Sequence, residues 1–367
     1  MIYVFLIRVF IFSYQNKKVT VNLNLLKMKK KEESVVARNG RLQVSGNKIL
    51  NEHNEGISLA GMSYFWSWIS VDEGTPEDFN GWGDKFYNEG TVNKLVDEWN
   101  CDILRCAVAI EGEHGYIAKP EETLDIVYKV VDRAIEKGIY VIVDFHTHEA
   151  EKHIDTAQEF FELIADKYHD VDNVIYEIFN EPIDHTWSDI KAYAEEVIPS
   201  IREYDEKNLI IVGTGYYSQN VHEIGEDTIQ DDNIAYSLHF YAQTHLGYPG
   251  DGGVRKNAEE ALERGNIALF VTEWGTVNSL GQGNTDPDST EAWMDFLAEN
   301  KISHLNWSVC DKPEPETASA LIEGADPEGN WSYPSDLTPS GQLVKPIIEG
   351  WQERVAQVDR KLVEDIK

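Results

Sequence analysis

The sequence is poor in residues that cross-link a chain or bind metals. Among 367 residues it has three cysteines, Cys101, Cys106 and Cys310, with no CxxC pair and no Cys/His spacing typical of a zinc site. Cys101 and Cys106 lie five residues apart in one predicted strand, so they should point to opposite faces. The composition therefore excludes a disulfide framework, and we expect the three thiols to behave as small buried hydrophobes.

Basic side chains are also scarce, because 32 Lys and Arg stand against 65 Asp and Glu, a net charge of −33. Such a surface repels nucleic acid and anionic lipid head groups, which excludes a nucleic-acid partner and argues against a stable membrane partner. Neutral or cationic ligands are favoured instead. The 42% of hydrophobic residues suffice for one large barrel or for two ordinary domains.

Long apolar runs are missing except at the N-terminus. Residues 1–12 are mostly apolar, but Arg8 interrupts the run, which is too short for a membrane span and makes a poor signal peptide. Eight of the 32 basic residues, but only two of the 65 acidic ones, precede Asn39. We therefore place residues 1–38 outside the catalytic fold, as an atypical export or anchoring segment or a disordered arm, and residues 39–367 in one domain.

From Gly56 onward, short apolar runs alternate with longer amphipathic stretches, a pattern that predicts parallel strands connected by helices. Eight such units in about 310 residues fit a single (β/α)8 (TIM) barrel. A doubly wound sheet would need a glycine-rich phosphate loop after the first strand, and GMSYFWSW is not one. The predicted strands are Ile57–Ser63, Ile103–Ile110, Tyr140–Phe145, Val174–Phe179, Leu209–Gly213, Ile234–Phe240, Ala268–Thr272 and Ile302–Ser308. The predicted helices include Glu121–Lys137, Asp155–Tyr168, Trp187–Glu203, Asn257–Arg264, Ser289–Glu299 and Leu343–Val355.

Polar and aromatic residues gather at the carboxyl ends of these strands, where barrels of this kind place their active sites. The fourth strand ends in Asn180-Glu181-Pro182 and the seventh in Glu273-Trp274. Any one such residue is most simply explained by packing or by a loop. Two carboxylates that converge with an arginine and two histidines would be costly for stability alone, so they indicate chemistry. The other residues at this rim include Trp66, Trp68, Arg105, His146, Tyr216, Tyr217, His239, Tyr241, Asn306 and Trp307.

A pair of carboxyl groups suits glycosidic bond cleavage, in which a protonated acid serves the leaving oxygen and a carboxylate serves the anomeric carbon. On a retaining enzyme Glu181 and Glu273 should lie about 5 Å apart. We expect Arg105 to keep Glu273 ionised, and burial beside a negative neighbour to keep Glu181 protonated, so that their pKa values shift in opposite directions. Tyr241 would donate to Glu273, and Asn180 would bind the 2-hydroxyl of the sugar.

The remaining residues at the rim suit a carbohydrate ligand. His146 and His239 would hold sugar hydroxyls or orient the carboxylates. Neutral sugars tolerate the negative field of the chain, and their rings have an apolar face that stacks on flat aromatic side chains. The side chains that offer such faces are Trp66, Trp68, Tyr217 and Trp307.

These segments resemble glycoside hydrolase family 5, in particular its bacterial endoglucanases of the cellulase A type. The similarity extends from about Gly40 to Trp351 and includes the motifs VIVDFHTHEA, VIYEIFNEP, SLHFYAQTH, LFVTEWGT and LNWSVCDKPEPETASAL. The resemblance implies a retaining endo-β-1,4-glucanase with Glu181 as acid/base and Glu273 as nucleophile. The surrounding site residues that it implies are Arg105, His146, Asn180, His239, Tyr241 and Trp307.

The resemblance also implies how the substrate is held. Lys312 and Glu314, in the DK-x-E stretch, would bind a glucose on the non-reducing side of the cleavage point. Tyr217 stands where many relatives carry a tryptophan, and it would stack on the leaving-group side. The expected partner is a β-glucan or a cello-oligosaccharide, with no cofactor and no metal, and the family implies a secreted protein, which we expect to be a monomer.

Three alternatives stay open. The same machinery could act on mannan, xyloglucan or mixed-linkage glucan, or the barrel could bind polysaccharide without cutting it. A metal-dependent hydrolase is the third alternative, because DFHTH places His146 and His148 on one face of a strand end. The resemblance assigns His146 to the sugar site, which leaves His148 as a loop or surface residue.

Overall fold

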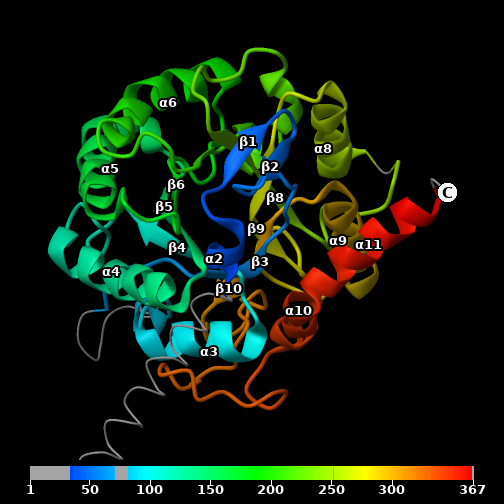
Figure 1. Cartoon of the computed structure of the whole chain (residues 1–367). Coiled ribbons are helices and arrows are strands. Elements are labelled where there is room, and N and C mark those ends of the chain that lie inside the picture. The colour runs from blue at the N-terminus through cyan, green and yellow to red at the C-terminus, as the bar shows by residue number, and fades with distance from the viewer. Residues whose placement is uncertain (1–33, 71–81, 251, 366–367) are drawn as a thin grey trace, which may run out of the picture.

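The computed structural model describes residues 34–70, 82–250 and 252–365. Eight parallel strands close into a barrel in the order β10-β3-β4-β5-β6-β7-β8-β9, with helices around the outside (Figure 1). The predicted single (β/α)8 barrel is confirmed. The barrel strands are β3 (Ala60–Tyr64), β4 (Ile103–Ala109), β5 (Tyr140–His146), β6 (Val174–Glu177), β7 (Ile210–Val212), β8 (Ile234–Tyr241), β9 (Leu269–Gly275) and β10 (His304–Val309).

All eight predicted strands are present, and their ends differ in ways that position the site. Strand β9 continues three residues past the predicted Thr272, because it pairs with β8 as far as Tyr241↔Gly275. Strand β6 stops at Glu177, two residues before the predicted end. As a result Glu273 lies within a strand, whereas Glu181 lies in the loop that follows β6.

The outer helices follow the predicted pattern with three differences. Helix α3 was not predicted, and the segment after β7 forms only short turns of helix. The predicted helix Leu343–Val355 is two helices that meet at Gly350, where α10 ends. The helices are α3 (Glu89–Trp99), α4 (Pro120–Lys137), α5 (Ile154–Tyr168), α6 (Trp187–Arg202), α7 (Gly215–Ser218), α8 (Gly253–Arg264), α9 (Pro287–Asn300), α10 (Pro339–Glu349) and α11 (Trp351–Asp365), with short 3-10 turns η2 (Asp84–Phe86), η3 (Ala150–His153) and η4 (Val221–Ile224).

The amino ends of the barrel strands are covered by helix α2 (Val35–Asn39) and an antiparallel hairpin of β1 (Gln43–Ser45) and β2 (Lys48–Leu50) (Figure 1). Leu42 and Ile49 of this cover pack against the first residues of the barrel strands. The backbone N–H of Val36 donates to the carbonyl of Gly138 at 2.9 Å. Residues 34–38, predicted to lie outside the fold, therefore pack against the barrel, whereas residues 1–33 lie outside the described residues.

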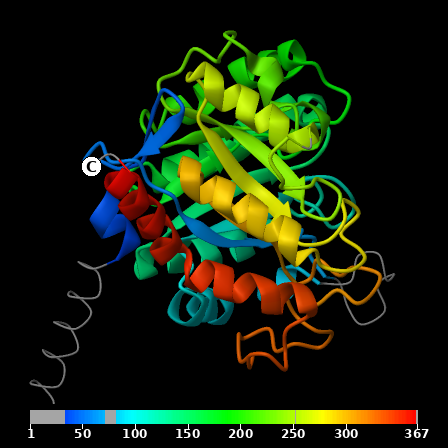
Figure 2. The same ribbon diagram turned by 90° about the vertical axis from the view of Figure 1, so that its right-hand side faces the viewer.

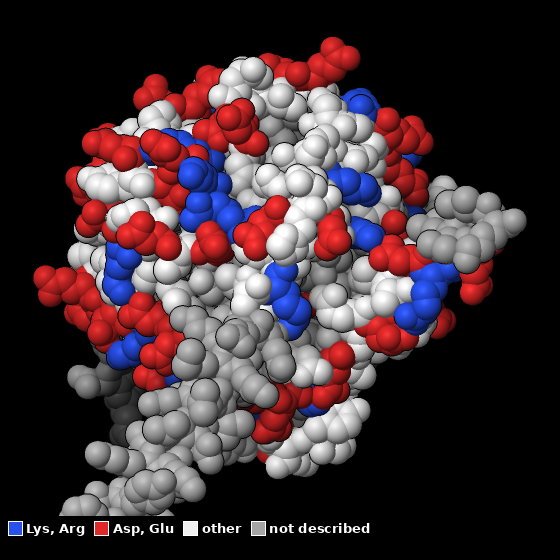
Figure 3. Space-filling view, viewed as in Figure 1, with Lys and Arg blue, Asp and Glu red and all other residues white. Residues whose placement is uncertain are grey.

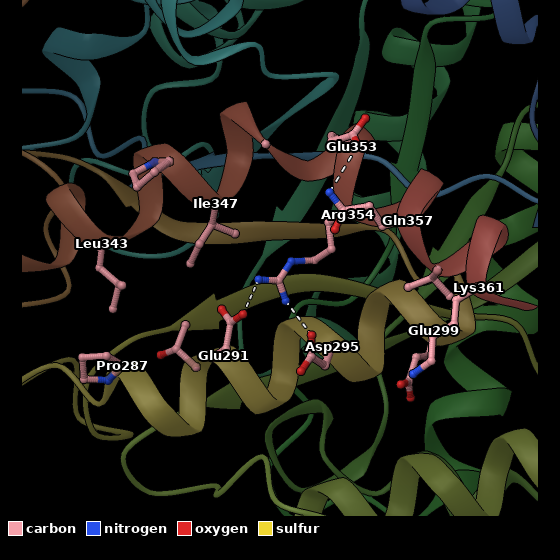
Figure 4. Close-up of a pocket in the computed structure, with 14 residues that line it drawn as sticks. Pro287, Glu291, Asp295, Glu299, Leu343, Ile347, Glu353, Arg354, Gln357 and Lys361 are labelled. Atoms are coloured by element: carbon pink, nitrogen blue, oxygen red, sulfur yellow. Dashed lines mark hydrogen bonds and ion pairs between the residues drawn. The ribbon is translucent and has the colours of Figure 1, made fainter.

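The seam between the last and the first barrel strands is covered by α11. Trp351 is fully buried, its ring meets that of His304 edge-on at 4.1 Å, and its Nε1–H donates to Ser58 Oγ at 3.0 Å. Figure 2 shows α11 and the hairpin at the same end of the molecule. In the groove between α9 and α10–α11, Arg354 binds Glu291 and Asp295 of α9 (Figure 4). Among the described residues, no helix is both long and apolar enough to cross a membrane.

Candidate active site

Arg105 is the central cation of the site. It projects from β4, is fully buried, and lies among three carboxylates: Glu177 at 2.7 Å, Asp144 at 2.9 Å and Glu273 at 3.2 Å. Burial alone would lower the pKa of Arg105, but Asp144, Glu177 and Glu273 raise it, so the side chain stays charged. A buried cation with several partners is a fixed electrostatic support for the groups it touches.

Arg105 also orients two polar residues that the sequence predicted at the rim. Its Nη2 donates to Asn180 Oδ1 at 2.7 Å, which leaves the Asn180 amide NH2 as a donor. His146 Nδ1 lies 2.6 Å from Asp144 Oδ2, and burial lowers the pKa of His146 well below its usual value. Neutral His146 therefore carries its proton on Nδ1, and its Nε2 is left as an acceptor.

The two predicted glutamates meet above this support. One oxygen of Glu181, one of Glu273 and a ring nitrogen of His239 lie within 4.8 Å of one another. In retaining glycosidases the two carboxyl groups are about 5–5.5 Å apart, whereas inverting enzymes need room for a water between them. Glu273 accepts a hydrogen bond from Tyr241 Oη at 2.7 Å, as predicted, and one from Arg105 Nη1 at 3.2 Å.

The predicted opposite pKa shifts are wrong, because both carboxyl groups are buried. Burial raises the pKa of Glu181 to about 7, with Glu177 adding to the rise, while His148 and Arg105 oppose it. Burial and the charge of Glu181 raise the pKa of Glu273, against His239, Arg105 and Tyr241. The part of this rise in the pKa of Glu273 that comes from the charge of Glu181 disappears when Glu181 is protonated. The donors around Glu273 then make it the group that ionises.

A chain of hydrogen bonds determines which atom of His239 carries the proton. Thr272 Oγ1 donates to Glu177 Oε1 at 2.7 Å, so it can only accept from His239 Nε2, which lies 2.8 Å away. Burial lowers the pKa of His239 to about 4, so the ring is neutral and its Nδ1 carries no proton. The 2.8 Å contact from Nδ1 to Glu181 Oε1 therefore requires the proton of Glu181. This arrangement favours the protonated form of Glu181.

Aromatic side chains line one side of the site. Trp66 stacks on Trp68 at 4.5 Å and meets His146 edge-on at 4.1 Å. Trp307 stacks on His146 at 5.3 Å. These predicted residues are thus brought together, with Phe65 next to Trp307. The His148 ring, next to Glu181, lies 6.1 Å from the Trp66 ring and 6.2 Å from the Tyr217 ring.

Glu316, and not the predicted Glu314, is the carboxylate beside Lys312. Glu314 is exposed, whereas the Glu316 carboxylate lies 3.6 Å from Lys312 Nζ, and burial raises the pKa of Glu316 to about 7. Lys312 Nζ also lies 5.3 Å from the Phe65 ring and 5.1 Å from that of Trp82, which the sequence analysis missed. The loop holds two residues more than the motif allows for, so the spacing pointed to the wrong glutamate.

His148 lies in the loop after β5, as predicted, but it also lies at the site. Its Nδ1 lies 3.2 Å from the carbonyl oxygen of Glu181 and 3.6 Å from the Glu181 carboxylate. Asp144, Glu177 and Thr272 were not predicted as site residues. Asp144 could have been found, because it lies two residues before His146 and side chains two residues apart in a strand share a face. Thr272 is one residue from Glu273, so its place at the site required the structure.

Among the described residues, the group that could hold a metal ion is Glu181, His239 and Glu273. The fit is poor, because the Arg105 guanidinium lies 3.2 Å from Glu273 and would repel a cation there. His146 and His148, which the sequence suggested as ligands, do not form such a group with a third residue in the part of the chain that the structure describes. The site therefore suits acid–base chemistry with a carboxylate nucleophile.

A (β/α)8 barrel with two carboxyl groups at this separation, beside an aromatic wall, defines a glycoside hydrolase. The family model described as Cellulase (glycosyl hydrolase family 5) matches residues 50–313. The chain therefore belongs to glycosyl hydrolase family 5, and the predicted membership is confirmed.

Relatives in sequence and structure agree with this assignment. Endoglucanase Z of Dickeya dadantii is 44% identical over 84% of this chain and 66% of its own length. An endoglucanase of Clostridium saccharobutylicum is 37% identical over 88% and 68%. Endoglucanase A of Evansella cellulosilytica is 40% identical over 73% of this chain and 54% of its own length. The chain thus spans about one half to two thirds of these relatives.

Two solved structures show the same barrel. A structure from Cytophaga hutchinsonii has a TM-score of 0.79 at 42% identity, covering 89% of this chain and all of that chain. The catalytic domain of a Thermobifida fusca endoglucanase has a TM-score of 0.77 at 32% identity, covering 86% of this chain and 99% of that chain. Both solved chains are covered almost completely by this chain.

Proposed function

We propose that the chain is a retaining endo-β-1,4-glucanase with Glu181 as acid/base and Glu273 as nucleophile. The observation that carries the proposal is the separation of the two carboxyl groups, within 4.8 Å, combined with their different hydrogen-bond partners. Glu273 accepts from a cation and a phenol, which stabilise its charge. Glu181 faces a histidine nitrogen that requires its proton.

The reaction follows from these two environments. The Glu273 carboxylate attacks the anomeric carbon, the bond to the leaving oxygen breaks, and the proton of Glu181 passes to that oxygen. In the second half, Glu181 takes a proton from water, the water oxygen bonds to the anomeric carbon, and Glu273 leaves as a carboxylate. The NH2 of Asn180 would donate to the 2-hydroxyl, where hydrogen bonds strengthen in the transition state.

A β-glucan is the proposed substrate on three grounds. Relatives that are 44% and 37% identical are named endoglucanases, and a variant of the Thermobifida fusca catalytic domain was solved with cellotetraose. Trp66 and Trp307 offer ring faces beside the carboxyl pair, and Lys312 with Glu316 offers hydrogen bonds. The surface seen in Figure 3 carries many acidic side chains, which a neutral polymer tolerates. A polymer of this size would be met outside the cell, so we also propose an extracellular enzyme.

The test is hydrolysis of carboxymethyl-cellulose, mixed-linkage glucan and mannan, with proton NMR of the newly released anomeric centre. We expect glucan cleavage that first releases the β-anomer. Glu273→Gln and Glu181→Gln should each lower turnover at least about a hundredfold, the scale of a lost catalytic group, without loss of folding. A first-formed α-anomer would exclude retention, cleavage of mannan alone would exclude a glucanase, and near-normal rates in either variant would exclude these roles.

A further inference from the structure

We propose that His148 is a positioning residue for the second half of the reaction, in which it stabilises the Glu181 carboxylate that takes a proton from water. The inference rests on the proposed function and extends it. The Nδ1 atom of His148 lies 3.2 Å from the backbone carbonyl oxygen of Glu181 and 3.6 Å from its carboxylate Oε2. Because a carbonyl oxygen can only accept, this nitrogen carries a hydrogen. His148 is therefore a donor directed at Glu181.

The Glu181 carboxyl group lies between two histidines of opposite effect. Its Oε1 is 2.8 Å from His239 Nδ1, which carries no proton, whereas its Oε2 faces the Nδ1–H of His148. His239 thus favours the protonated form of Glu181, and His148 favours the ionised form. The reaction needs both forms, because Glu181 gives a proton to the leaving oxygen in the first half and takes one from water in the second.

The second half depends on a donor such as His148. Burial raises the pKa of Glu181 to about 7, and His148, ahead of Arg105, opposes that rise. The Arg105 guanidinium is hydrogen-bonded to Glu177, Glu273 and Asn180, so it does not serve Glu181 directly. The charged and titratable groups around Glu181 are His148 in the loop after β5, Arg105 on β4, Asp144 on β5, Glu177 on β6, His239 and Tyr241 on β8, and Glu273 on β9.

The loop after β5 holds His148 in this place. The backbone N–H of Glu181 donates to the carbonyl of Thr147 at 3.5 Å, and the hydroxyl of Thr147 donates to Glu111. The side chain of His148 is 35% exposed, so it has room to move closer than the 3.6 Å of the free enzyme. Catalytic contacts that are long in a free enzyme commonly tighten when the substrate is bound.

The experiment isolates the second half of the reaction. The glycosyl-enzyme is trapped with a dinitrophenyl β-cellobioside that carries fluorine in place of the 2-hydroxyl, excess reagent is removed, and the return of activity is measured against pH. In His148→Leu we expect the acidic limb of this reactivation rate to move up by about one pH unit, because loss of the donor raises the pKa of Glu181. Below the limb, reactivation should slow about tenfold, and above it the rate should match the wild type.

The first half provides an internal control. The dinitrophenyl leaving group needs no proton, so the rate of trapping in His148→Leu should stay within about twofold of the wild type. His148→Asn places an amide N–H near the position of Nδ1 and should keep the wild-type limb. The matched control is His169→Leu, which removes a histidine at the end of α5, where the chain has returned to the amino ends of the strands. Urea unfolding checks that each variant is folded.

The outcomes distinguish this role from the proposed function. A limb that stays in place in folded His148→Leu, or that moves equally in His148→Asn, would overturn the role of His148 and leave the proposed function intact. Trapping that slows as much as reactivation would also overturn it, because it would indicate a general effect on the site. If mass spectrometry showed no glycosyl-enzyme on the wild type, the retaining mechanism would fail, and the role of His148 with it.

Discussion

Replacement of Thr272 by valine should move the alkaline limb of the pH–activity profile to lower pH. Burial raises the pKa of Glu181 to about 7, so its acid function is present below that pH and is lost above it. The Thr272 hydroxyl, which bonds Glu177 and accepts from His239 Nε2, fixes the tautomer that requires the proton of Glu181. Valine has nearly the same shape but cannot accept that hydrogen bond.

Without the hydroxyl, His239 is free to carry its proton on Nδ1 and to donate to the Glu181 carboxylate. A hydrogen bond to a charged group contributes about 1.5–3 kcal/mol, and one pKa unit corresponds to about 1.4 kcal/mol. The pKa of Glu181 should therefore fall by about one to two units, and the limb should move with it. The pKa falls because the new hydrogen bond from His239 stabilises the charged form of Glu181.

The assay is kcat/KM on a soluble cello-oligosaccharide from pH 4 to 9 for the wild type, Thr272→Val and Thr272→Ser. Thr272→Ser keeps a hydroxyl and should keep the wild-type limb. Because Thr272 is fully buried, urea unfolding of each variant checks that it is folded. A limb that stays in place in folded Thr272→Val, or that moves to higher pH, would refute the hydrogen-bond chain.

Three further predictions follow from the structure. Glu316→Gln should raise KM for cello-oligosaccharides about tenfold, because it removes the carboxylate beside Lys312. Glu314→Gln should change KM by no more than about twofold, because Glu314 is exposed. If steady-state kinetics gave the reverse order, Glu314 would be the partner of Lys312, as the motif predicted. Trp351→Ala should lower the free energy of unfolding, measured by urea titration, by about 3–5 kcal/mol, because the side chain is fully buried. A loss under about 1 kcal/mol would contradict the conclusion that Trp351 stabilises the seam between β10 and β3. Incubation with a chelator should leave glucan hydrolysis unchanged, because Arg105 occupies the position where a cation would approach Glu273; inactivation that a divalent metal reverses would contradict this.

The sequence predicts what depends on local pattern. Eight apolar runs became eight barrel strands, because a strand buried on both faces leaves a continuous apolar signal. Glu181 and Glu273 were found because they closely follow two of these apolar runs. The hairpin of β1 and β2 escaped prediction, since three-residue strands are too short for periodicity to register.

What depends on the packing of distant segments could not be predicted. The choice between Glu314 and Glu316 depends on the path of a loop, which the spacing of a motif does not determine when residues are inserted. The pKa of Glu273 depends on how deeply the site is buried, and charge counting alone gave the wrong direction. The role of Thr272 requires the distances to Glu177 and His239, residues far away in the sequence.

The contact between Trp351 and Ser58 has a consequence for biogenesis. These residues are 293 positions apart, and their side chains lie at the seam where β10 meets β3. Until the ribosome has added Trp351, the nascent chain has its barrel strands but lacks the side chain that covers this seam. Closure of the ring, and with it the final alignment of Trp307 on β10 with Arg105 on β4, should thus wait for α11 and leave the edges of β3 and β10 available to chaperones until then.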